Sequence, residues 1–130
     1  MIGKRTGSIT PSDLLHFVET DEFAQDWERL GLSTESDLWH LEISIMECPD
    51  VYPVISGTGG LRKLRFVPRD WKQGKRGAVR VCYAYFPEHW LVLLVIAYGK
   101  GEKDDLTAKE AAEIRKYLLG VKRWLADHNR

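Results

Sequence analysis

Features that mark several common protein classes are scarce in this sequence of 130 residues. No apolar run approaches the roughly 20 residues that a membrane-spanning helix needs. The longest such run, over 90–98, has the length of a strand. Residues 1–12 lack the apolar stretch of a secretory signal, so we interpret them as a flexible leader to a single domain over 13–130. We therefore expect a cytoplasmic protein without membrane contacts.

Patterns of metal ligands and cofactor sites are also missing. The two cysteines, Cys48 and Cys82, show no paired spacing, and we expect both to be free thiols. The four histidines are scattered along the chain, without the spacing of a zinc site. The glycine-rich stretch over 57–60 precedes a strand pattern, whereas a phosphate-binding loop precedes a helix. We expect neither a metal nor a cofactor.

The formal net charge is zero, which by itself argues against a nucleic-acid partner. The charges are nevertheless strongly separated along the chain. Residues 19–50 hold ten acidic residues and one basic residue, whereas residues 60–80 hold eight basic residues and one acidic residue. Such a chain can present a locally positive surface while it stays neutral overall. On charge alone, two solvated faces that partly neutralise each other explain the pattern equally well.

Hydrophobic periodicity predicts one α+β domain with the order βααβββα. A short strand ends near Val18, and Thr20 has the position of a helix N-cap. The expected elements are a first helix up to Gly31, a second from Ser33 or Thr34 to Pro49, strands over 61–67, 78–86 and 90–98, and a last helix from Thr107. Thr107 and Glu110 have the spacing of a capping box. The buried stripe expected for this last helix is Ala111, Ile114, Leu118, Val121 and Leu125. The connections between the last three strands are too short for parallel crossovers, so these strands are antiparallel neighbours.

Side-chain alternation places several cations on one face of this sheet. In 61–67, Lys63 and Arg65 share the face opposite to Leu64 and Phe66. Arg80, in the next strand, is flanked on its face by small residues, which predicts a shallow groove beside it. We interpret Lys63, Arg65 and Arg80 as one concave phosphate-binding surface.

The strand over 90–98 is apolar on both faces, so we expect it to be central in the sheet. The segment after this strand adds further candidates. Tyr98 is placed to stack on a base or to donate a hydrogen bond, although a half-buried strand end explains it as well. Lys100 and Lys103 lie in a turn with Gly99 and Gly101, where backbone and ligand can approach closely. A solvated turn is the competing interpretation for both lysines.

Three ordered stretches of this chain resemble the core of RelE/HigB-type toxins. They are Ser-Gly-Thr-Gly-Gly-Leu-Arg-Lys-Leu-Arg over 56–65, Gly-Lys-Arg-Gly-Ala-Val-Arg-Val-Cys-Tyr over 74–83, and Ile-Ala-Tyr-Gly-Lys-Gly-Glu-Lys-Asp-Asp-Leu over 96–106. The resemblance implies a RelE-like fold, with a small antiparallel sheet, an N-terminal helical hairpin and a C-terminal helix. It also implies the toxin of a type II toxin–antitoxin pair, which cuts mRNA on the ribosome without a metal and uses the RNA 2′-hydroxyl as nucleophile.

The resemblance also implies roles for individual residues. Arg80 would clamp the scissile phosphate beside Lys63 and Arg65, since fixed cations stabilise the charge that develops there. Crowding by like charge makes Lys63 the candidate base, and Lys100 would steady the leaving group. The implied RNA-binding residues are Arg62, Lys75, Arg76, Tyr98 and Lys103. The implied partners are the ribosome, mRNA and a cognate antitoxin of the HigA-like, helix-turn-helix kind. We expect the antitoxin to cover the positive surface or to displace an element against it, most simply with an acidic or helical segment.

The sequence departs from this family at two positions. Some members have a catalytic arginine where this chain has Gly101, and a tyrosine at about the position of Leu106. Two other functions therefore remain open. One is a ParE-like toxin that binds DNA gyrase and cuts nothing, although the basic strand face favours the nuclease. The other is an inactive relative kept as an antitoxin-bound repressor component.

Overall fold

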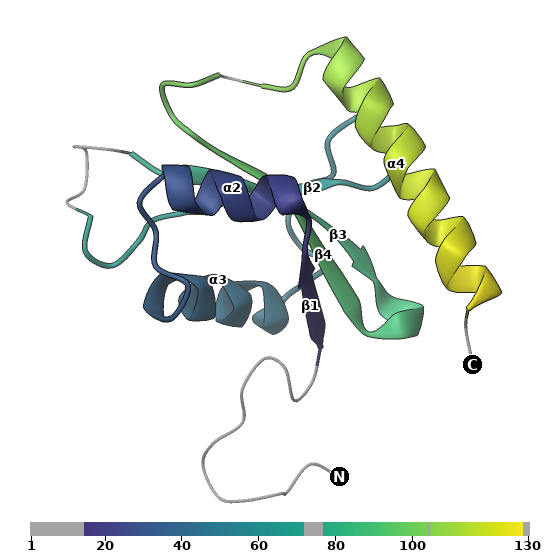
Figure 1. Ribbon diagram of the computed structural model, residues 1–130, viewed down its shortest axis with the longest axis horizontal. Helices are drawn as coiled ribbons and strands as arrows, with labels where there is room; N and C mark the ends of the chain where they lie inside the picture. Colours follow the sequence, from purple (N-terminus) through teal and green to yellow (C-terminus); the bar gives the residue numbers. More distant parts are fainter. Residues whose placement is uncertain (1–14, 72–76, 104, 129–130) are drawn as a thin grey trace, which may run out of the picture.

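The structure is a computed structural model that describes residues 15–71, 77–103 and 105–128, so the predicted leader lies outside the described residues. The predicted order of elements is confirmed (Figure 1). In chain order the elements are β1 (His16–Glu19), α2 (Asp21–Arg29), α3 (Ser36–Glu47), β2 (Arg62–Phe66), β3 (Val79–Phe86), a 3-10 turn (Pro87–His89), β4 (Leu91–Gly99) and α4 (Ala108–Asp127).

The four strands form one sheet in the order β1-β4-β3-β2. The last three strands are antiparallel neighbours, as predicted. The strand β1 adds a parallel pair, because His16–Glu19 runs alongside Leu91–Leu94, so the whole sheet is mixed. The central position predicted for the apolar strand β4 is also confirmed, and its residues 92–98 are all buried.

The helices α2 and α3 lie together on one side of the sheet (Figure 1). Thr20 caps α2 as predicted, since its Oγ1 accepts from the Phe23 N–H at 2.9 Å. The start of α3 is later than predicted because Ser33 first accepts from the backbone N–H groups of Ser36 and Asp37. The largest buried side chains of this layer are Phe23, Trp27, Leu41, Ile45 and Tyr83.

The helix α4 covers part of the opposite face. Its predicted capping box is present, with Thr107 and Glu110 each bonding the other's backbone N–H. The predicted inner stripe is confirmed, although only Leu118 is fully buried, and Ile114, Val121 and Leu125 are partly buried against the same cluster. In the described part of the chain, no helix has the length and apolar character to cross a membrane.

Candidate nucleic-acid interface

The strand register gathers most of the predicted cations at one end of the sheet. Arg65 on β2 lies opposite Arg80 on β3, and Arg80 lies opposite Tyr98 on β4. Directly opposed side chains lie on the same face with Cβ atoms about 5 Å apart. Lys63 lies on this face as well, two register pairs further along, opposite Cys82. We call Lys63, Arg65, Arg80 and Tyr98 the basic row.

The members of the basic row lie at different depths. Arg65 is exposed and belongs to β2, the edge strand of the sheet. Arg80 is partly buried on the inner strand β3, and its Nη1 donates to the Ala78 carbonyl at 2.8 Å. The Arg65 side chain has no hydrogen bond or ion pair to any other described residue. Among the described residues, an anion at this end of the sheet would therefore meet an unpaired guanidinium at the rim and an oriented guanidinium further in.

Lys63 has an anionic partner that the sequence did not indicate. Its Nζ lies 3.0 Å from Oδ1 of Asp105, in the segment between β4 and α4. The Lys63 side chain is 28% exposed, whereas that of Asp105 is 77% exposed. An exposed carboxylate in this place is easily exchanged for another anion. Asp105 therefore occupies a position that a phosphate would take, and the choice of Lys63 as base stays a prediction.

Tyr98 lies deeper than a base-stacking role requires. The residue is only 3% exposed, so in this arrangement its ring is not open to a base. Lys103 lies over the ring, with Nζ 5.5 Å from the centroid, and the same Nζ is 2.7 Å from Oε2 of Glu110. The Tyr98 hydroxyl is buried and has no hydrogen-bond partner among the described residues.

Tyr98 and Cys82 form the floor of this site, and burial is the main cause of their pKa shifts. It raises the pKa of Tyr98 to about 12, with Cys82 and Asp105 adding to the effect and Arg80 opposing it. Burial also raises the pKa of Cys82 to about 12, although Lys63 and Lys103 act in the opposite direction. Both groups are neutral at pH 7, so the floor is uncharged and the fixed charges come from the lysines and arginines above it.

The prediction of a shallow groove along β3 is wrong for much of the strand. Cys82 and Ala84 are buried together with Phe86 and Leu118, because α4 packs against the small side chains on that part of the strand. Arg80, at the other end of this face, is partly buried.

Arg62, predicted to bind RNA, lies on the other face of the sheet. Its register partner is Tyr83, whose ring belongs to the core under α2 and α3. The Arg62 Nη1 donates to the carbonyls of Asp50 at 3.0 Å and Tyr52 at 2.6 Å. These bonds fix the backbone that follows α3, which separates Arg62 from the basic row. Strand alternation already places Arg62 with Leu64, and that signal was available from the sequence.

Lys100 lies at the same end of the sheet as Arg80. Val79 is the register partner of Gly99, so Lys100 follows the last pair between β3 and β4. Its side chain is exposed and its stem lies close to Gly77, where an added Cβ would be 2.9 Å from the Lys100 Cδ. Lys75 and Arg76 lie outside the described residues.

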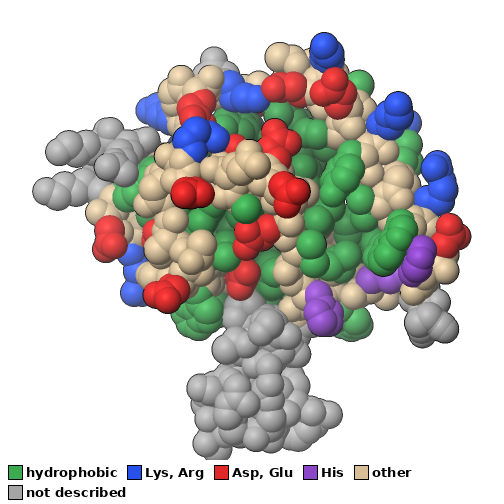
Figure 2. Space-filling view, viewed as in Figure 1, with side chains coloured by type: hydrophobic (Ala, Val, Ile, Leu, Met, Phe, Trp, Pro, Cys, Tyr) green, Lys and Arg blue, Asp and Glu red, His purple; other side chains and the backbone are tan. Residues whose placement is uncertain are grey.

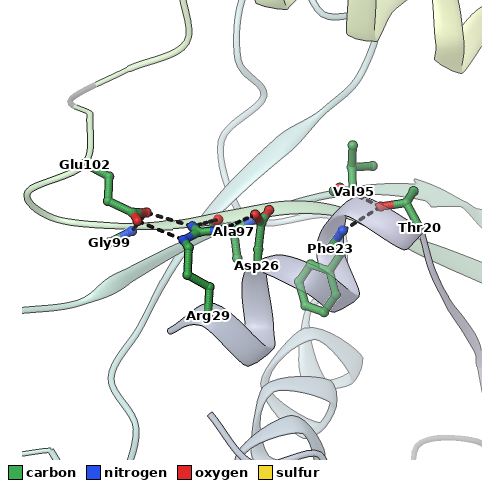
Figure 3. A network of polar contacts seen from close by, with 8 residues as sticks. All are labelled: Thr20, Phe23, Asp26, Arg29, Val95, Ala97, Gly99 and Glu102. Atoms are coloured by element: carbon green, nitrogen blue, oxygen red, sulfur yellow. Dashed lines mark hydrogen bonds and ion pairs between the residues drawn. The ribbon is translucent and has the colours of Figure 1, made fainter. Parts of the chain in front are cut away.

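The loop after β4 is anchored to α2 by a polar network (Figure 3). Arg29 bonds Glu102 through Nε at 3.0 Å and Nη2 at 2.9 Å, and its Nη1 lies 2.6 Å from Asp26. The Glu102 Oε1 also accepts from the Gly99 N–H at 2.9 Å. The bond from Arg29, followed by that from Gly99, lowers the pKa of Glu102. The network fixes the start of the loop that carries Lys100 and Lys103.

The two positions where the sequence departs from the RelE pattern do not join the basic row. Gly101 is exposed in the turn after β4, and Leu106 is partly buried against the cluster beneath α4. Among the described residues, no three or more His, Cys, Asp or Glu side chains come together in an arrangement that could hold a metal ion.

A comparison with protein-family models finds no match. Among solved structures, the chain is similar to the E. coli toxin RelE, in the free state of an arginine double mutant. The two sequences are 18% identical, the match covers 85% of this chain and 97% of that one, and the TM-score is 0.48.

Proposed function

We propose that this chain is the toxin of a type II toxin–antitoxin pair and an endoribonuclease that cleaves mRNA on the ribosome. The observation that carries the proposal is the placement of Arg65 and Arg80 as a register pair, with Lys63 on the same face and Lys100 at the same end of the sheet. Three cations from β2 and β3 around a neutral floor suit a phosphodiester, whose negative charge grows in the transition state. The sequence motifs of the RelE/HigB kind supply the toxin class.

The proposed reaction needs no metal. The RNA 2′-hydroxyl attacks the adjacent phosphorus while the bond to the 5′-oxygen breaks, which leaves a 2′,3′-cyclic phosphate and a 5′-hydroxyl. Lys63 takes the proton of the attacking hydroxyl. Lys100 steadies the negative charge on the departing 5′-oxygen, which takes up a proton from water to give the 5′-hydroxyl. Arg80 and Arg65 hold the non-bridging oxygens, where bidentate guanidinium contacts fix orientation as well as charge.

RNA binding in this scheme includes an exchange of anions. The Lys63–Asp105 pair is 3.0 Å long and lies at the surface, and a phosphate entering the basic row displaces the Asp105 carboxylate from it. Lys103 lies close to Tyr98 at the inner end of the row and contacts the RNA backbone after it leaves Glu110. The ribosome supplies the mRNA in an extended, unpaired form.

The proposed partner is a cognate antitoxin of the HigA-like, helix-turn-helix kind. It silences the toxin in the cytoplasm, where the ribosomes are. Coverage of the basic row is the simplest route to silencing, because it removes the cations that the phosphate needs.

Primer-extension mapping of cellular mRNA after a short pulse of expression tests this function. Cuts at codon-spaced positions are expected for the wild-type chain and for Arg123→Ala, which removes an exposed arginine on α4. They should be absent for Arg80→Ala. Intact transcripts together with DNA damage would contradict the proposal and would indicate a ParE-like gyrase inhibitor instead.

A further inference from the structure

A second surface of this chain has the opposite charge to the basic row. It is a groove of about 700 Å³ between α2, the outer edge of β4 and α4. We call it the acidic groove. Its lining includes six carboxylates and two cations, the latter being Arg29 and Lys103. The carboxylates are those of Asp21, Glu22, Asp26, Glu102, Glu110 and Glu113.

Three of the six carboxylates are already paired within the chain. Asp26 and Glu102 bond Arg29, and Glu110 bonds Lys103. The other three, Asp21, Glu22 and Glu113, are exposed and make no ion pair with any described residue. Asp21 and Glu22 lie in the first turn of α2, whereas Glu113 lies on α4. Unpaired negative charge is therefore present on both walls.

The floor of the acidic groove is apolar. It is formed by Val95, Ile96, Leu106 and Ile114, and Tyr117 lines it with 46% of its surface exposed. In Figure 2, hydrophobic side chains fill the space between α2 and α4, and acidic side chains gather along α2. A small polycation would neutralise the walls but leave this floor uncovered. A polypeptide segment with both cationic and apolar side chains complements walls and floor together.

Tyr98 closes one end of the groove. Its hydroxyl is buried and makes no hydrogen bond of good geometry in the described part of the chain, although it interacts with the buried Cys82 thiol. This end of the groove is therefore uncharged at pH 7, and the charges of the groove come from its walls.

The bound segment does not need to extend the sheet. The strand β1 covers β4 only over Leu91–Leu94, and side chains already occupy the edge beyond it (Figure 3). Thr20 Oγ1 donates to the Val95 carbonyl at 2.7 Å, and Asp26 Oδ2 accepts from the Ala97 N–H at 2.9 Å. These bonds protect the edge from an added strand, so recognition in this groove depends on side chains.

We propose that the acidic groove binds a segment of a partner protein in which basic and apolar side chains alternate. The cations of the segment pair with Asp21, Glu22 and Glu113, and its apolar side chains cover Ile114 and Tyr117. The proposal does not depend on RNA cleavage. Tyr98 and Lys103 belong to both surfaces, so a bound segment lies directly beside the basic row.

Titration of the isotope-labelled full chain with a short synthetic peptide of alternating Lys and Leu tests this proposal by NMR. Amide shifts are expected at Val95, Ala97 and Tyr117. The double variant Glu22→Lys/Glu113→Lys should bind the peptide about tenfold more weakly or worse, because it places like charges against each other. The control Glu28→Lys/Glu47→Lys changes the net charge equally at two exposed positions outside the groove, and should retain the affinity.

Three results would overturn the proposal. The first is an equal loss of affinity in the control double variant, which would show attraction by overall charge alone. The second is equal binding of a peptide of alternating Glu and Leu. The third is full competition by spermine at the same concentration, which would make the groove a site for small cations and not for a polypeptide.

Discussion

The two faces of the sheet are built in different ways. Beneath α2 and α3, large side chains fill the space completely, and Phe23, Trp27, Leu41 and Ile45 are each no more than 2% exposed. Beneath α4, β3 presents the small residues Cys82 and Ala84, and only one residue of the 20-residue helix is fully buried. The first face is closed along its length, whereas the second opens at the end that carries Arg80.

We therefore expect stability to depend mainly on the first face and function on the second. Dense aromatic packing on one face supplies the apolar burial that holds the sheet together. The other face is then free to carry charged side chains that contribute little to folding. Substitutions on the first face should change the free energy of unfolding, and substitutions in the basic row should change cleavage.

The largest effect is expected from Trp27→Ala. Its ring stacks on Phe23 at 5.3 Å and its Nε1 donates to the Ser33 carbonyl at 2.8 Å. Truncation should lower the free energy of unfolding by about 3–5 kcal/mol, as for other buried aromatic residues. Urea denaturation followed by circular dichroism measures it. Trp124→Ala, at a tryptophan that is 57% exposed, is the control and should cost less than about 1 kcal/mol. An equal loss of unfolding free energy in the two variants would contradict the proposed difference between the two faces.

A smaller loss is expected from Leu118→Ala on the other face. Leu118 is 1% exposed, but its neighbours on α4 are only partly buried, so the helix can settle into the space left. The expected cost is about 2–3 kcal/mol. Hydrogen exchange should show faster exchange confined to α4, with the amides of α2 and α3 unchanged. Uniform acceleration across both layers would show that the two faces unfold as one unit.

Glu42 on α3 should make stability depend on pH. Burial, followed by the nearby Glu19, raises the pKa of Glu42 to about 7. The pKa of Glu42 in the folded chain exceeds the ordinary 4.5. Its contribution to the free energy of unfolding is therefore complete below about pH 4.5 and is lost as the pH rises through about 7. Glu42→Gln should therefore be more stable than the wild type at pH 8, by about 1–2 kcal/mol after discount for partial exposure. The exposed Glu47→Gln on the same helix should leave the pH profile unchanged, and an unchanged profile for Glu42→Gln would refute the assignment.

The smallest effect is expected from Asp105→Asn. The Lys63–Asp105 pair is exposed and costs little to break. Its loss should tighten RNA binding by about two- to fivefold, since a surface ion pair is worth less than about 1 kcal/mol. Filter binding of a short RNA at low salt measures it, with the exposed Asp127→Asn as control. Weaker binding after Asp105→Asn would show that the carboxylate assists RNA and does not compete with it.

Much of the fold follows from local patterns. The alternation of Leu64 and Phe66 with Lys63 and Arg65 fixes which face each side chain occupies, and this was confirmed. Thr20 and Thr107 were predicted as helix caps because a hydroxyl can bond the free N–H groups of the first turn, and both are confirmed.

Local patterns of this kind could not predict contacts between segments that are distant in the sequence. The parallel pairing of β1 with β4 joins residues far apart in the chain. The Lys63–Asp105 pair depends on the path of the loop after β4. The sequence predicted a groove along these small side chains, but α4 packs over Cys82 and Ala84 and fills it. Tyr98 is buried by the same packing, so a residue predicted to meet RNA lies in the floor.

We propose that the open end of the second face cleaves RNA without supporting the fold. Single-turnover cleavage of mRNA on purified ribosomes tests it, with Arg80→Ala compared with Arg123→Ala and with urea denaturation of each variant. We predict that Arg80→Ala cleaves about 100- to 1,000-fold more slowly, the loss typical when a group that stabilises transition-state charge is removed, while its free energy of unfolding and the rate of Arg123→Ala stay near wild type. Wild-type cleavage by a folded Arg80→Ala variant would contradict the claim.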